Sequence, residues 1–287
     1  MSLLVPAFNI SLVVTVFSFA LTAQRFDDVR YLWRRPRLLV VSLLAMFVVT
    51  PVAALAIALT FDIPVSAQVA IVALSFSMIP PLLPQKEIAA GGDESYGIGL
   101  VIYVAVLAPF GIAALVDLLG RVMDRPYGVP PGEVAATVAG LVVLPLVAGL
   151  IFGRLWPGAT AVIQATAPKV AASVTGVAVI VFLVVTASVV WDYMTGWTLV
   201  AAVTFNVAAL GIGHVLGGPD RRQAVVLAMS CAGRHPAIAM TIAATNYPGE
   251  NFAAAVILVL VLNGVLTPLY LKMIDRNRSE RAPEPVQ

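Results

Sequence analysis

The sequence is poor in charge and in cysteine. Only 11% of its 287 residues are charged, whereas a soluble domain carries roughly 25%. A soluble fold of this length could not hide the 60% of residues that are hydrophobic, because one core cannot hold so much apolar surface. The single cysteine, Cys231, excludes an intramolecular disulfide framework. These shortages disfavour a soluble domain and point to lipid as the solvent.

Instead of charged segments, the sequence contains long apolar runs. A helix needs about 20 apolar residues to cross a bilayer, and unbroken runs such as 170–191 favour helices over the alternating strands of a barrel. We predict an all-α polytopic membrane protein with about nine spans. The predicted spans are residues 3–23, 38–60, 65–91 (interrupted), 95–119, 134–155, 170–191, 195–217, 223–246 and 252–273.

The two ends of the chain differ. No basic segment precedes the first run and no small-residue cleavage site follows it, so we predict a retained span rather than a signal peptide. Residues 276–287 are polar and contain proline, which predicts a disordered tail. Residues 1–287 are expected to form a single membrane domain.

Lysine and arginine lie unevenly about the spans. Arg121 and Arg125 follow the fourth span, whereas most of the 17 basic residues follow odd-numbered spans. The latter are Arg25, Arg30, Arg34, Arg35, Arg37, Arg154, Lys169, Arg221, Arg222, Lys272, Arg276, Arg278 and Arg281. Short cytoplasmic segments are enriched in basic residues. We therefore predict a plasma (inner) membrane protein with its N-terminus outside and its C-terminus in the cytoplasm.

Two spans are interrupted in a similar way. Pro80, Pro81 and Pro84 cannot all continue a helix in the third span. Gly233 and Pro236 interrupt the eighth, and in each span a serine precedes a break proline by six residues. Paired broken helices in opposite orientations are typical of inverted-repeat transporters, where they place the substrate site near the midplane.

Four polar residues near the breaks are candidate substrate contacts. Arg234 is costly inside a membrane, and it either binds an anionic substrate or satisfies helix-end carbonyls. His235 is a hydrogen-bonded core residue, a substrate contact or a proton relay. Lys86 either meets substrate or extends to water, with Glu87 as its partner. Asn263, like Asn206, lies mid-span and either joins helices or lines a cavity; His214 is expected to be structural.

The chain resembles the bile acid:sodium symporter family over roughly residues 10–275. The stretches that carry the resemblance are Arg34–Pro36, Met46–Pro51, the proline-rich break with Gly92 and Asp93 beyond it, Leu144–Leu150, and His235–Ala243. The resemblance implies a panel of spans 3–23, 134–155 and 170–191. It also implies a core of residues 38–119 and 195–273, in which the two broken helices cross.

The resemblance also implies positions for two sodium ions, where this sequence departs from the family. The aligned positions are Ser230, Arg234, Gly97, Val101 and Lys86, with Met46 or Ala45 in the second span. Two cationic side chains and few oxygen atoms stand there, and like charges repel a metal cation in a dehydrated site. We predict that Lys86 and Arg234 occupy the space of the ions, that no metal binds, and that sodium coupling is lost.

The sequence therefore favours a secondary transporter of small organic anions that works by motion of core against panel. Coupling to a proton or to an exchanged anion stays open. Alternatives are a sodium-coupled symporter, a cation/proton antiporter and an auxin-efflux-like carrier. A membrane sensor lacks an attached signalling domain. A membrane enzyme lacks an acidic residue to orient His235, and no cofactor or nucleic-acid partner is expected.

Labelling of single cysteines tests the predicted orientation. In a Cys231→Ala background, a cysteine at Gly128 should react with an impermeant thiol reagent from outside. A cysteine at Asn277 should react only after permeabilisation, because the basic tail is predicted to be cytoplasmic. Reversed labelling would overturn the orientation and the repeat assignment that depends on it.

Overall fold

The computed structural model describes residues 4–22, 26–123, 131–160, 196–236 and 252–279, with short helical pieces between 162 and 177 and between 238 and 243. Every regular element in this part of the chain is helical. Five of these helical segments are long and apolar enough to cross a bilayer: Pro36–Thr60, Glu94–Ala113, Ala135–Leu155, Trp197–Leu216 and Ala253–Arg276. The predicted all-α membrane fold is confirmed. The count of nine stays a prediction, since span 170–191 and the second half of 223–246 fall largely outside the described residues.

The N-terminal half begins with α1 (Leu4–Thr22) and the short α2 (Phe26–Trp33). The predicted span 38–60 is built from α3 (Pro36–Leu44), one wider π-helical turn (Ala45–Val49) and α4 (Thr50–Thr60). Span 134–155 repeats this pattern with α8 (Pro131–Val138), a π-helical turn (Ala139–Val143) and α9 (Leu144–Leu155). Pro51 and Pro145 each follow the wide turn. Because proline lacks an N–H, a local widening lets the helix continue past it.

The remaining elements surround the predicted breaks. The interrupted third span is α5 (Val65–Phe76) followed by α6 (Leu83–Ala89), and α7 (Glu94–Met123) comes next. In the second half, α11 (Trp197–Leu216) leads to α12 (Arg221–Ala232), which ends at the second break. The last helix is α14 (Ala253–Ser279).

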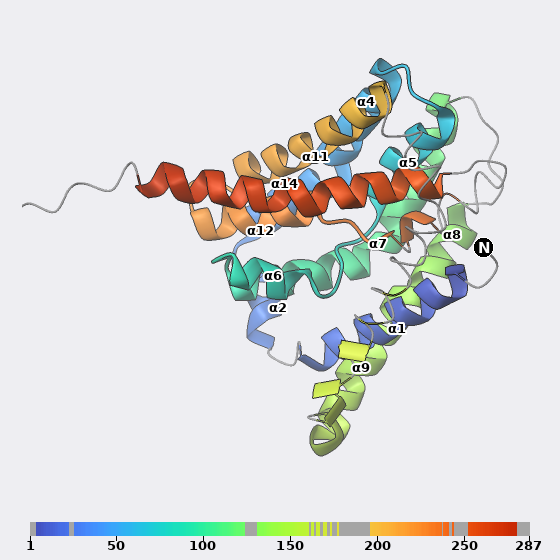
Figure 1. Ribbon diagram of the computed structural model, residues 1–287. Helices are drawn as coiled ribbons and strands as arrows, with labels where there is room; N and C mark the ends of the chain where they lie inside the picture. Colours follow the sequence, from blue (N-terminus) through green and yellow to red (C-terminus); the bar gives the residue numbers. More distant parts are fainter. Residues whose placement is uncertain are drawn as a thin grey trace, which may run out of the picture.

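The helices form two groups (Figure 1). In one group α1 packs along α9. In the other, α11 contacts α12, α14 and α4, while α5 packs between α4 and α14. The long α7 contacts α2 and α6 and also reaches α8, so it links the groups. The assignment of these groups to a panel and a core, like the place of span 170–191, stays a prediction.

Several helix faces are apolar and exposed. Phe110 is 73% exposed, Leu144 69% and Val215 74%. Large exposed apolar surfaces are unfavourable in water, whereas hydrocarbon covers them and tolerates helices, because each helix satisfies its own backbone. These faces are therefore the surfaces that the bilayer covers.

The contact between α11 and α12 depends on a glycine. A Cβ atom at Gly213 would lie 2.4 Å from both the Ala228 Cα and the Leu227 carbonyl oxygen. Small residues allow such close approach of membrane helices. The neighbouring Gly211 faces the other way, with no atom within 4 Å of a Cβ placed there.

This pair of glycines gives a matched stability test. Gly213→Ala should destabilise the protein by about 1–3 kcal/mol, because the new methyl group meets backbone atoms that cannot move aside. Gly211→Ala should be neutral or stabilising by roughly 0.5–1 kcal/mol, since alanine favours a helix interior. Thermal unfolding in detergent measures both. Equal melting temperatures for the two variants would contradict the close α11–α12 contact.

Candidate functional site

Both predicted breaks are real interruptions of helical structure. Helix α5 ends at Phe76, and the chain stays non-helical or in a turn until α6 begins at Leu83. Helix α12 ends at Ala232, and three non-helical residues precede Pro236, where a helix resumes. Proline suits the first position of a helix, because an N–H group at that position would have no partner within the helix. Both breaks leave backbone N–H and C=O groups without partners inside a helix. These groups need other hydrogen-bond partners, because they lie away from water.

The two breaks lie in direct contact. The backbone N–H of His235 donates a 3.0 Å hydrogen bond to the Met78 carbonyl. A Cβ atom at Gly233 would meet the Leu83 side chain at 2.9 Å. Ser77, Met78 and Ile79 are almost fully buried. The chain thus brings together two interruptions more than 150 residues apart.

Arg234 donates hydrogen bonds to both interrupted spans at this junction. The guanidinium donates from Nε to the Cys231 carbonyl at 2.8 Å and from Nη1 to the Ser77 carbonyl at 3.0 Å. Both acceptors lie where a helix has just ended or is ending, so the cation stands at the negative ends of two half-helices. Arg234 is only 4% exposed, and its Nη2 has no hydrogen-bond partner among the described residues. The geometry supports a role in satisfying carbonyls, and it leaves one donor for a further acceptor.

A pocket of about 220 Å³ opens beside the junction. Its wall combines α6, the end of α12 and α14, and the lining residues are Leu83, Lys86, Met229, Gly233, Asn263, Gly264, Thr267, Pro268 and Leu271. The predicted contacts Lys86 and Asn263 therefore line one pocket. Gly233 belongs to the same wall, whereas Arg234 and His235 are not among the lining residues. Lys86 is exposed and can meet a solute that enters.

The mid-span asparagines join helices. Asn206 is fully buried and donates from Nδ2 to the carbonyls of Ala202 at 2.9 Å and Val259 at 3.2 Å. Asn263 donates to Asn206 Oδ1 and to the Ala232 carbonyl, both at 3.1 Å. Asn263 thus connects α14 to α11 and to the last residue of α12, and it also lines the pocket. The sequence left these two roles as alternatives, and Asn263 combines both.

Glu87 is a site residue that the sequence analysis missed. Its side chain is 1% exposed, and its Oε1 accepts a 2.8 Å hydrogen bond from the Ser230 hydroxyl. A Cβ atom at Gly97 would lie 2.6 Å from its Oε2. Ser230 and Gly97, two positions aligned with family sodium ligands, therefore flank this carboxyl group. Val101, a third such position, is buried one turn further along α7.

The expected pairing of Glu87 with Lys86 is wrong. Successive residues of a helix point about 100° apart, so Glu87 faces α12 while Lys86 lines the pocket. Leu83 and Pro84, four and three residues earlier, are buried on the same face as Glu87. This helical spacing was the available signal that Glu87 is buried.

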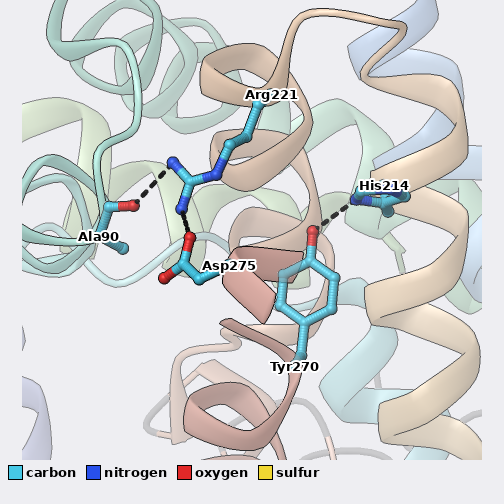
Figure 2. A network of polar contacts seen from close by, with 5 residues as sticks. All are labelled: Ala90, His214, Arg221, Tyr270 and Asp275. Atoms are coloured by element: carbon cyan, nitrogen blue, oxygen red, sulfur yellow. Dashed lines mark hydrogen bonds and ion pairs between the residues drawn. The ribbon is translucent and has the colours of Figure 1, made fainter. Parts of the chain in front are cut away.

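A group of polar contacts connects the ends of several core helices (Figure 2). Arg221 pairs with Asp275 and donates to the Ala90 carbonyl at 3.5 Å, which connects α12 and α14 to the end of α6. His214 and the Tyr270 hydroxyl lie 2.7 Å apart, in line with a structural role for this histidine. Nearby, Tyr31 donates to Asp93 at 2.9 Å. Burial and this hydrogen bond raise the pKa of Tyr31, so its hydroxyl stays a donor.

The model of the sodium bile acid symporter family matches residues 9–192. The chain has no significant match among curated proteins. The match covers more than half of the sequence, including the first break, Lys86, Glu87 and Gly97. The chain belongs to the sodium bile acid symporter family.

Proposed function

We propose that this protein is a secondary transporter of small organic anions that is not coupled to sodium. The observation that carries the proposal is the pocket beside the crossed breaks, where Lys86 and Asn263 lie together. An ammonium group and polar atoms in a mostly apolar wall suit a carboxylate or a similar anion. Sites for drug-sized ligands enclose about 300–1,000 Å³, so a pocket of about 220 Å³ favours a smaller molecule.

The hydrogen bonds of Arg234 to backbone carbonyls support the proposed loss of sodium coupling. Hard cations are bound by several oxygen ligands at once. Two carbonyls at the junction, those of Cys231 and Ser77, already accept from the guanidinium. A fixed side-chain cation satisfies the carbonyls as an ion would, but it cannot leave with the substrate.

The proposed motion uses the two helix groups. The α1–α9 pair contacts the remainder through few helices, with α7 reaching α8 from the other group. In transporters with broken helices, one such group moves against the other about the binding site. We assign α1 and α9 to the panel and the helices around the crossed breaks to the core. His235 is buried at the junction and does not line the pocket, so its role as a substrate contact or proton relay stays a prediction.

The polar contacts at one end of the core support the proposed orientation of the protein in the membrane. Arg221, Ala90 and Asp275 meet there (Figure 2), and Tyr31 and Asp93 meet nearby. All five belong to segments that the charge distribution assigns to the cytoplasm. The pocket, which extends along α14 towards Leu271, then lies in the cytoplasmic half of the molecule.

Uptake into proteoliposomes tests the proposal. A screen of small labelled carboxylates should identify one that accumulates at equal initial rates in sodium, potassium and choline buffers of matched ionic strength. Lys86→Gln should reduce that uptake at least severalfold, because the pocket loses its exposed cation. Lys272→Gln is the matched control, since Lys272 does not line the pocket, and it should transport normally.

Saturable stimulation by sodium alone would show instead that the chain is a sodium-coupled symporter. Binding without uptake would favour a sensor, and chemical conversion of the anion would favour an enzyme.

Substitution of Arg234 separates its two roles. Arg234→Ala should lower stability by about 1–3 kcal/mol for each buried carbonyl that loses its donor, and it should weaken or abolish transport. Arg234→Lys should rescue only in part, because a single ammonium group does not reproduce a planar fork that reaches two carbonyls. Melting temperature and uptake per folded protein are measured together, with the exposed Arg222→Ala as control. Normal uptake by folded Arg234→Ala would make Arg234 structural only.

A further inference from the structure

The carboxyl group of Glu87 is buried, and only one of its two oxygen atoms is hydrogen-bonded in the described part of the chain. Oε1 accepts from the Ser230 hydroxyl at 2.8 Å. Oε2 has no hydrogen-bond partner in the described part of the chain. It lies against α7, where a Cβ at Gly97 would be 2.6 Å away, and that same Cβ would be 3.7 Å from the Pro84 Cβ. An ionised carboxylate offers about four acceptor sites, so this environment suits the charged form poorly.

No cation compensates a charge on Glu87 among the described residues. Helix α6 packs against α7 and α12. Besides Glu87, the ionisable groups of the three helices and the turn before α7 are Lys86, Asp93, Glu94, Tyr96, Tyr103, Asp117, Arg121, Arg221, Arg222 and Cys231, with Arg234 beyond α12. Asp117 and Arg121 belong to turns of α7 more than five helical turns beyond Gly97.

Each of the nearest groups is engaged elsewhere. Arg221 pairs with Asp275, and Arg234 donates to two carbonyls. The Tyr96 hydroxyl is hydrogen-bonded to Ser42 at 2.7 Å. Lys86 lines the pocket, and Cys231 is a fully buried thiol that offers no positive charge. In the part of the chain that the structure describes, Glu87 therefore meets one neutral donor and no counter-charge.

We propose that Glu87 is a proton-binding site, which holds a proton while it is buried between α7 and α12 and releases it when α6 moves away. A buried carboxyl group without a counter-charge is favoured in its neutral form. Release breaks the carboxyl O–H bond and passes the proton to water, while the electron pair stays on the carboxylate. Contact with water then solvates the charge, and return of the proton permits burial again.

A proton fits this site better than a metal cation. The carboxyl group and one hydroxyl, that of Ser230, are the oxygen groups that the hydrogen bonds bring together here. Helix α7 passes close to Oε2 at Gly97, where an added Cβ would lie only 2.6 Å away, and this limits the space for an ion and its further ligands. Hard cations require such ligands, whereas a proton requires only the carboxyl oxygen itself.

The position of Glu87 also suggests how proton binding is linked to the proposed transport, on which this step rests. Lys86 and Glu87 are consecutive residues of the seven-residue α6. One lines the pocket and the other is buried against α7 and α12. A movement of α6 that follows anion binding at Lys86 therefore changes the surroundings of Glu87 as well. The protein then carries an anion together with a proton.

The first test measures stability and needs no substrate. Purified wild-type protein and Glu87→Gln are melted at about pH 5.5 and about pH 8.5, a range in which a buried carboxyl group can titrate. Both should melt alike at acid pH. At alkaline pH the wild type carries a buried charge that the amide lacks, so Glu87→Gln should melt higher by at least about 2 °C. Glu94→Gln, an exposed acid on the next helix, should match the wild type at both pH values.

Two outcomes would overturn the proton site. An equal offset between wild type and Glu87→Gln at both pH values would make Glu87 a structural residue only. A rise of the wild-type melting temperature in sodium over choline, absent in Glu87→Gln, would make the site a cation site. If Glu87→Gln does not fold, Ser230→Ala gives the same information. It removes the one hydrogen bond to the carboxylate and should lower the melting temperature at alkaline pH more than at acid pH.

The second test measures transport. An acid-outside pH gradient should accelerate uptake of the identified anion by wild type and by Glu94→Gln. Glu87→Gln should lose the acceleration while it still exchanges internal for external anion. Acceleration that persists in Glu87→Gln would place the coupled proton elsewhere. Absence of uptake by wild type in every buffer would defeat the proposed transport function, but it would leave the stability result intact, so the two failures are distinguishable.

Discussion

The structure depends on how two interrupted helices find hydrogen-bond partners for their backbone groups inside a membrane protein. Prolines break the first helix, and Gly233 and Pro236 break the second. The freed carbonyls cannot reach bulk water, because most of the break residues are buried. The chain solves this by placing one break on the other, so that the His235 N–H meets the Met78 carbonyl and Arg234 bridges two helix ends. The pocket, the position of Lys86 and the burial of Glu87 all follow from the way in which this junction orients α6 and α12.

Charge at this junction is divided among three side chains with different surroundings. Arg234 is buried and bound to carbonyls, Lys86 is exposed at a pocket, and Glu87 is buried against a hydroxyl. In a medium of low polarity, each surrounding favours a different function. A fixed cation stabilises the backbone, an accessible cation attracts an anion, and an uncompensated acid holds a proton. These three environments are the basis of the proposed carrier, in which a proton takes the place of the coupling ion of the family.

Much of this arrangement was predictable from composition and spacing. The apolar runs predicted the helices, and the prolines predicted where α5 and α12 would end, because loss of an N–H breaks a helix wherever it occurs. The structural role of His214 and the double role of Asn263 were among the stated alternatives. The pairing of Glu87 with Lys86 was wrong, because neighbours in sequence point to different sides of a helix.

The sequence by itself determined that the chain lies in a membrane and that two of its helices are broken, since both properties follow from local composition. Only the tertiary structure decided which groups meet at the breaks. Ser230 reaches Glu87 across 143 residues, and Arg234 reaches Ser77 across 157. Such contacts depend on the rotation and depth of whole helices, and these are fixed by packing such as the close approach at Gly213. Glu87 could be read from the sequence as an acidic residue, but its burial without a partner cation among the described residues is a property of the fold.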